Sequence, residues 1–104
     1  MGISEVAQNC RAVLENYYGP RFSGLVLYGS VARDQAELGS DIDLLVLLNK
    51  PFDYFQELRR IIDLLYPIQL DSDRLISAKP APLDEFENGS IELYRNAKRE
   101  GVLL

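Results

Sequence analysis

The chain contains no histidine and no tryptophan, and it has one cysteine, Cys10, among its 104 residues. Without histidine, the chain itself offers no His-activated serine or cysteine nucleophile and no His-ligated zinc site. One cysteine forms no internal disulfide, which fits a reducing compartment. Chemistry at a site of this chain must therefore rely on carboxylates, hydroxyls or basic side chains.

Positive charge and long apolar runs are also scarce. Eleven Lys and Arg residues against sixteen Asp and Glu residues give a net charge of −5, and this charge opposes unassisted binding to a nucleic-acid backbone. No stretch approaches the ~18 apolar residues of a spanning helix, and the N-terminus lacks the basic and then apolar order of a signal peptide. We therefore expect a cytoplasmic protein that binds neither nucleic acid nor membrane.

The composition and the apolar pattern predict one domain over residues 1–104. With 47% hydrophobic and 26% charged residues, the chain has the composition of a soluble globular domain. Helical spacing or short apolar runs predict helix, strand, short helix, strand, helix, strand and helix over residues 4–18, 25–28, 30–37, 41–48, 54–66, 68–76 and 90–99. This order predicts an α/β (α+β) fold with a small β-sheet and flanking helices.

Two further features refine this expectation. The unbroken apolar run from Leu44 to Leu48 predicts a central strand that is covered on both faces. Pro67 is expected to end the helix of residues 54–66, and residues 79–82, Lys-Pro-Ala-Pro, are expected to form a stiff connector.

Two aspartates at the start of the predicted central strand are candidates for a functional site. Asp41 and Asp43 are two residues apart, so on a strand both side chains project from the same face. Neighbouring carboxylates repel and raise each other's pKa unless a cation lies between them, and hard oxygen ligands suit Mg²⁺. The pair therefore predicts a magnesium site.

A glycine turn precedes this strand in the sequence. Gly29 permits a sharp turn and the close approach of a ligand, and Ser30 begins a short helix whose first N–H groups are free to hold a phosphate. Taken alone, Gly-Ser after a strand is more often only a turn. Beside a paired-carboxylate metal site, it predicts phosphoryl or nucleotidyl transfer from a nucleoside triphosphate with Mg²⁺.

The string from Gly29 to Val46 reads GSVARDQAELGSDIDLLV. It resembles the signature of minimal nucleotidyltransferase (MNT) domains in the polymerase-beta-like superfamily. The closing Arg99-Glu100-Gly101 is also similar to the C-termini of these small proteins. The resemblance covers essentially the whole chain and implies a small mixed sheet in the polymerase-beta-like nucleotidyltransferase fold.

The resemblance also implies a set of site residues. Gly29, Ser30 and Ser40 would bind the nucleotide, and Asp41 and Asp43 would be Mg²⁺ ligands. A third acidic residue from a later strand would complete the site.

Two residues compete for the third carboxylate. Asp71 and Asp73 lie within residues 70–75, and on a regular strand both would share one face. An acidic loop that enters an edge strand is the alternative for either of them. We favour Asp73, so the predicted catalytic and metal-binding residues are Asp41, Asp43 and Asp73.

A function and a partner are implied by the same resemblance. We expect a Mg²⁺-dependent enzyme that moves AMP from ATP to a hydroxyl of a partner protein, with this chain as the antitoxin of an all-helical HEPN toxin. The alternative is a binding module that neutralises a helical toxin by contact alone and retains the acidic site for binding or as a vestige.

Overall fold

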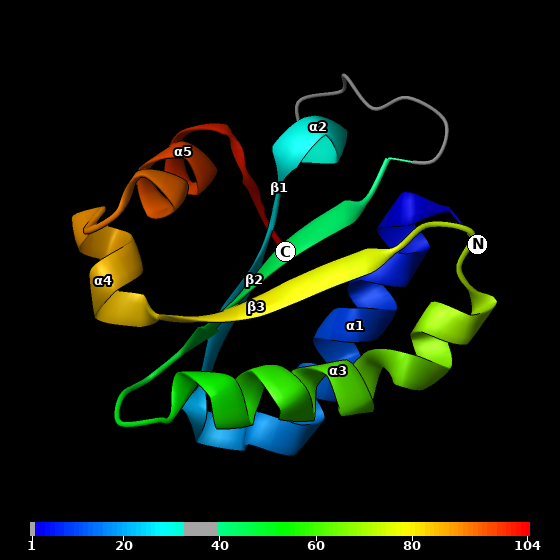
Figure 1. Ribbon diagram of the computed structural model, residues 1–104, viewed down its shortest axis with the longest axis horizontal. Coiled ribbons are helices and arrows are strands. Elements are labelled where there is room, and N and C mark those ends of the chain that lie inside the picture. Colours follow the sequence, from blue (N-terminus) through cyan, green and yellow to red (C-terminus); the bar gives the residue numbers. More distant parts are fainter. Residues whose placement is uncertain (1, 33–39) are drawn as a thin grey trace.

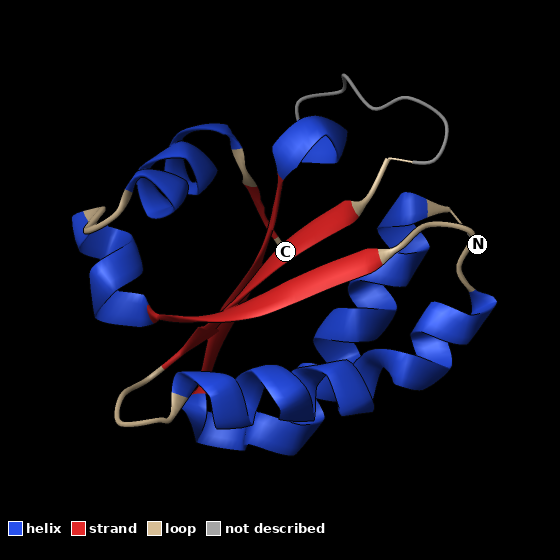
Figure 2. Cartoon of the chain, in the orientation of Figure 1, coloured by secondary structure: helices blue, strands red, loops and turns tan. Residues whose placement is uncertain are grey.

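The computed structural model describes residues 2–32 and 40–104, and it arranges helices on both faces of one sheet (Figure 1, Figure 2). The elements are α1 (Ile3–Tyr18), the 3-10 turn η1 (Gly19–Arg21), β1 (Phe22–Tyr28), α2 (Gly29–Ala32), β2 (Ile42–Leu48), α3 (Tyr54–Asp71), β3 (Ile76–Pro82), α4 (Leu83–Asn88), α5 (Glu92–Glu100) and β4 (Val102–Leu103). The strand order is β3-β2-β1-β4. β1 is antiparallel to β2 and β4, whereas β3 is parallel to β2, so the predicted mixed sheet with flanking helices is confirmed.

β2 lies inside the sheet, and its side chains alternate between two apolar cores. Leu44, Val46 and Leu48 pack in the core that α1 and α3 cover. Leu45 and Leu47 pack in the core that α4 and α5 cover. The prediction of a central strand covered on both faces is confirmed, and strand alternation places Asp43 on the same face as Leu45.

Two polar contacts position α3. The Asp53 side chain caps the helix by accepting a hydrogen bond from the Gln56 backbone N–H at 2.9 Å. The buried Glu57 carboxylate accepts a hydrogen bond from the Tyr18 hydroxyl at 2.8 Å, which joins α3 to the end of α1. Because both contacts are at the N-terminal end of α3, they fix how this helix begins.

The predicted end of this helix at Pro67 is wrong, since α3 continues through Pro67 to Asp71. Proline removes one helical hydrogen bond, but Ile68 still packs against the core beyond it. The Gln69 side chain accepts from the Ile76 N–H at 2.7 Å and donates to the Arg74 carbonyl at 3.0 Å. These contacts stabilise the last turn. Neither α3 nor any other described helix is both long and apolar enough to cross a membrane.

The predicted strand within residues 68–76 is also wrong, because β3 runs from Ile76 to Pro82. It includes the segment 79–82 that was expected to be a connector. Its prolines are tolerated because β3 is an edge strand, where one side needs no ladder hydrogen bonds.

Other boundaries differ less from the expectation. The last helix spans Glu92–Glu100 and ends at Gly101, close to the predicted 90–99. The short helix predicted over 30–37 is present as α2, and residues 33–37 lie outside the described residues. No pattern of side chains predicted α4 or the two-residue strand β4.

Candidate functional site

Gly29 and Asp43 meet where β1 ends. Tyr28, the last residue of β1, is the register partner of Asp43 in β2. Gly29 follows with a φ of 78°, in the left-handed region that favours glycine. A Cβ built on Gly29 would collide with Oδ2 of Asp43. Both conformation and space therefore require glycine here, and the turn lies directly against the carboxylate.

Asp41 and Asp43 are close enough to influence each other. Asp43 is half-buried, and Asp41 is exposed beside it. Burial raises the pKa of the Asp43 carboxyl, the charge on Asp41 raises it further, and Lys79 lowers it. A half-buried carboxylate with a like charge beside it is stabilised by a divalent cation, and its oxygens are the hard donors that Mg²⁺ prefers. The donor pair therefore fits this metal.

The two predicted nucleotide-binding serines flank this pair. Ser30 follows Gly29 in α2, and Ser40 directly precedes Asp41, with both half-buried. The Arg74 guanidinium donates to the Ser40 backbone carbonyl at 2.9 Å. The register of β1 with β2 and the chain connections to these strands place Gly29, Ser30, Ser40, Asp41 and Asp43 at one end of the strand pair.

Asp71 and Asp73 do not share a strand. Asp71 is the last residue of α3, and Asp73 lies exposed in the connection to β3. The expected strand face was wrong because α3 continues past Pro67 and displaces the start of β3. In residues 2–32 and 40–104, no three His, Cys, Asp or Glu side chains gather as a metal-binding group. The role of Asp73 as third ligand stays a prediction.

β3 instead presents a hydroxyl and an ammonium group on the face of the carboxylate pair. Asp43 is in register with Ser77, and Leu45 is in register with Lys79. Ala81, two residues further on, packs in the same core as Leu45. Lys79 was missed because the proline-rich segment was interpreted as a connector. The alternation of polar Ser77 and Lys79 with apolar neighbours was the available signal.

A cleft adjoins the glycine turn on the side of α5. Its volume is about 210 Å³, and its lining residues are Tyr28, Gly29, Leu93, Asn96, Ala97 and Glu100. Burial raises the pKa of Tyr28 to about 12, with smaller contributions from Asp43 and Tyr54. Tyr28 is therefore a neutral hydroxyl at the floor of this cleft at ordinary pH.

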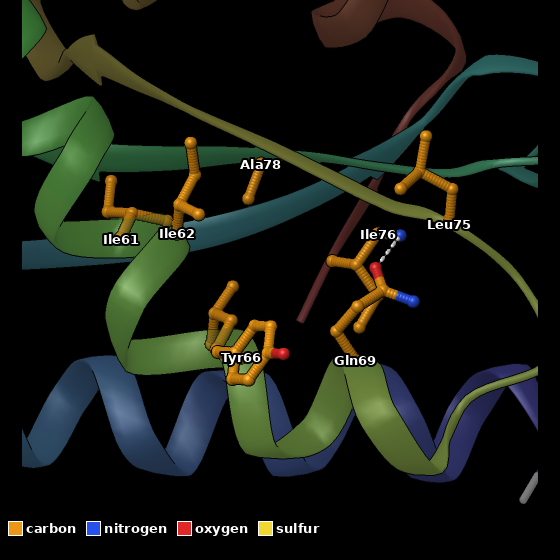
Figure 3. Close-up of a pocket in the computed structure, with 8 residues that line it drawn as sticks. Ile61, Ile62, Tyr66, Gln69, Leu75, Ile76 and Ala78 are labelled. Carbon is orange, nitrogen blue, oxygen red and sulfur yellow. Dashed lines mark hydrogen bonds between the residues drawn. The ribbon is translucent and has the colours of Figure 1, made fainter.

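A second hollow lies on the opposite face of the sheet, between α3 and β3 (Figure 3). It has a volume of about 240 Å³ and is lined by Ile61, Ile62, Leu65, Tyr66, Gln69, Leu75, Ile76 and Ala78. The lining is apolar apart from Gln69 and the Tyr66 hydroxyl. This hollow holds none of the predicted site residues.

The glycine turn thus lies against Asp43, and Asp41 lies beside it, in a mixed α/β fold. Residues 11–103 match the family described as the nucleotidyltransferase domain, and the chain belongs to this family. No curated protein matches the chain significantly.

A solved structure described as the crystal structure of a toxin–antitoxin with AMP-PNP has a similar fold. Its TM-score is 0.55 at 20% sequence identity, over 92% of this chain and 70% of that chain. At this level of identity the likeness concerns the fold alone.

Proposed function

We propose that this chain is a Mg²⁺-dependent nucleotidyltransferase that moves AMP from ATP to a hydroxyl group of a partner protein, with pyrophosphate as the leaving group. The observation that supports it most is the contact between Gly29 and Asp43, beside Asp41, in a member of the nucleotidyltransferase domain family. The bare Gly29 backbone lets a phosphate approach the carboxylates closely.

Each site residue has a distinct part in this proposal. Gly29, Ser30 and Ser40 bind and orient the triphosphate, with the hydroxyls as hydrogen-bond donors. Asp41 and Asp43 hold Mg²⁺, and Asp73 is the proposed third carboxylate. The metal, when bound, neutralises phosphate charge and lowers the pKa of an attacking hydroxyl.

The partner protein is proposed to be a helical HEPN-type toxin, with this chain as its antitoxin. The similar fold in a toxin–antitoxin structure solved with AMP-PNP supports a toxin partner and a nucleotide ligand. A protein acceptor also suits a chain with a net charge of −5, because a polynucleotide acceptor needs a positive groove.

Incubation with ATP, Mg²⁺ and a co-expressed helical partner from the adjacent reading frame tests this proposal. Mass spectrometry is expected to show AMP on the partner with the unaltered chain and none with Asp43→Asn. Glu5→Gln is the control for loss of one surface carboxylate, because Glu5 is exposed on α1 and is not among the site residues. Absence of AMP from the partner at every protein concentration would contradict transfer.

One observation favours the contact-only alternative. Five large apolar side chains of α3 and the segment after it are each more than half exposed: Phe55, Ile62, Tyr66, Leu70 and Leu75. Together they present on the order of 500 Å², which is the upper range for one patch on a monomer. Under this alternative, the same toxin binds the patch through an apolar face of one of its own helices. The exposed charged side chains beside the patch include Arg59 and three aspartates, Asp63, Asp71 and Asp73. This acidic excess favours a basic rim on the toxin face.

The two candidates predict different variant behaviour. Ile62→Asp is expected to abolish a complex that depends on the α3 patch, whereas Asp43→Asn leaves it intact. A stable complex that never acquires AMP, and that Ile62→Asp disrupts, would favour the contact-only antitoxin.

A further inference from the structure

We propose that Lys79 of β3 is a phosphate-binding residue of the nucleotide site, where it supplies a fixed positive charge beside Asp41 and Asp43. This inference rests on the proposed function, because it concerns the same nucleotide.

The sheet register places Lys79 beside the carboxylate pair. β3 runs parallel to β2, with Asp43 opposite Ser77 and Leu45 opposite Lys79. Register partners in neighbouring strands project from the same face. The packing agrees, since Leu45 and Ala81 share the core under α4 and α5, while Ala78 lies in the core on the other face. Lys79 therefore lies on the strand next to Asp43, two residues beyond Ser77, which is the register partner of Asp43.

The strand offers no acidic residue at this place. Its residues on the Asp43 face are Ser77, Lys79 and Ala81. A lysine in this row, compared with a carboxylate at the same place, makes the local charge more positive by two units. This difference of two charges favours an anionic triphosphate over additional cations.

Lys79 is half-buried and has a free ammonium group. Within the part of the chain that the structure describes, its Nζ makes no hydrogen bond and no ion pair. Its charge nevertheless acts on Asp43, whose pKa it lowers. A phosphate oxygen is a suitable partner for a lysine point charge. The unused charge faces the place where the proposed triphosphate binds.

The positive charge of Lys79 leads to one specific prediction about how ATP binding depends on Mg²⁺. Where Mg²⁺ alone offsets the carboxylates, removal of the metal abolishes ATP binding. Where Lys79 also contacts the phosphates, weaker ATP binding remains in EDTA and depends on this residue. Nucleotide binding, and not transfer, is therefore the informative measurement.

The test is calorimetric titration of ATP into the full chain, once with Mg²⁺ and once with EDTA. The unaltered chain is expected to bind ATP in both buffers, and Lys79→Gln is expected to lose about tenfold or more in EDTA, as for the loss of one charge-assisted hydrogen bond. Lys79→Arg should retain most of the affinity. Lys98→Gln is the matched control, since Lys98 is exposed on α5 and donates to the Glu87 carbonyl.

A charge reversal gives a second readout that does not involve nucleotide. Lys79→Asp introduces the carboxylate that β3 lacks, so Mn²⁺ binding followed by electron paramagnetic resonance is expected to tighten while ATP binding in EDTA disappears. Equal ATP affinity of the unaltered chain and Lys79→Gln in both buffers would overturn the role of Lys79 and leave the proposed function standing. No ATP binding by the unaltered chain in either buffer would overturn both.

Discussion

At Gly29, both the backbone conformation and the available space disfavour a side chain. Its φ of 78° disfavours any side chain, and a Cβ would collide with Oδ2 of Asp43. We expect Gly29→Ala to destabilise the fold by about 1–3 kcal/mol and to weaken ATP binding, because the carboxylate must move. Urea denaturation and calorimetry measure the two effects.

Gly2→Ala is the control for this substitution, since a Cβ at Gly2 meets nothing within 4 Å. Its stability should stay within about 0.5 kcal/mol of the unaltered chain. A Gly29→Ala variant that matches this control in stability and ATP affinity would show that the close approach at the turn has no importance.

Asp43 predicts a pH-dependent effect at the same site. Its pKa is raised above the ordinary 3.8, chiefly by burial and then by Asp41, so the folded chain holds this proton more tightly than the unfolded chain does. Without metal, stability therefore falls as pH rises from 3.8 through the raised pKa. Asp43→Asn has no ionising carboxyl at this position, so it does not undergo this loss of stability.

Thermal unfolding in EDTA from about pH 3 to about pH 7 measures the difference between the two chains. Asp43→Asn should match the unaltered chain at the acid end and exceed it in stability at neutral pH. A variant that is less stable at neutral pH would contradict the charge repulsion argued for the pair.

At the scale of elements, the hydrogen bond from Tyr18 to Glu57 joins α1 to α3. The Glu57 carboxylate is buried, and it also forms an ion pair with Arg60 Nε at 3.4 Å. Tyr18→Phe leaves this carboxylate with one partner fewer, so we expect a loss of about 1–3 kcal/mol in the free energy of unfolding. Denaturant titration measures it.

Tyr17→Phe is the neighbouring control. The Tyr17 hydroxyl accepts a hydrogen bond from Arg60 at 2.6 Å, but this contact is exposed. Its removal should cost less than about 0.5 kcal/mol, because water replaces the lost partner. Similar losses for both tyrosines would mean that burial of the Glu57 contact is unimportant.

The sequence predicted best those elements whose side chains repeat with a regular period. The first helix and the central strand were predicted close to their observed bounds, and the spacing of Asp41 and Asp43 was sufficient to predict that the two carboxylates interact. These features depend on local geometry alone. Asp41 and Asp43 were identified as candidate site residues from the same spacing.

The region from Pro67 to Pro82 was predicted poorly because tertiary contacts override local preferences there. Contacts of Ile68 and Gln69 extend α3 past Pro67. The edge position of β3 accommodates two further prolines, Pro80 and Pro82. Each proline was taken as a boundary, so the start of β3 was expected too early. As a result, Lys79 was not identified as a candidate site residue, and Asp73 was expected on a strand.

At the scale of the whole molecule, charge predicts which class of acceptor receives AMP. The net charge is −5, so a polynucleotide would be repelled. A docked protein, in contrast, would supply the acceptor hydroxyl and a second wall for the nucleotide site. With labelled ATP and Mg²⁺, we expect label on the helical partner and none on bulk RNA. Label on RNA alone would contradict this prediction.

The most direct test of the nucleotide site is ATP titration in Mg²⁺ with Asp41→Asn, Asp43→Asn and the control Asp63→Asn. Each site variant removes one charge with little change in shape, and Asp63 is exposed on α3. The carboxylate pair predicts that both site variants lose about tenfold or more in affinity while remaining folded, and that the control binds as the unaltered chain does. Unchanged ATP affinity in Asp43→Asn would contradict the assignment of this pair as the site.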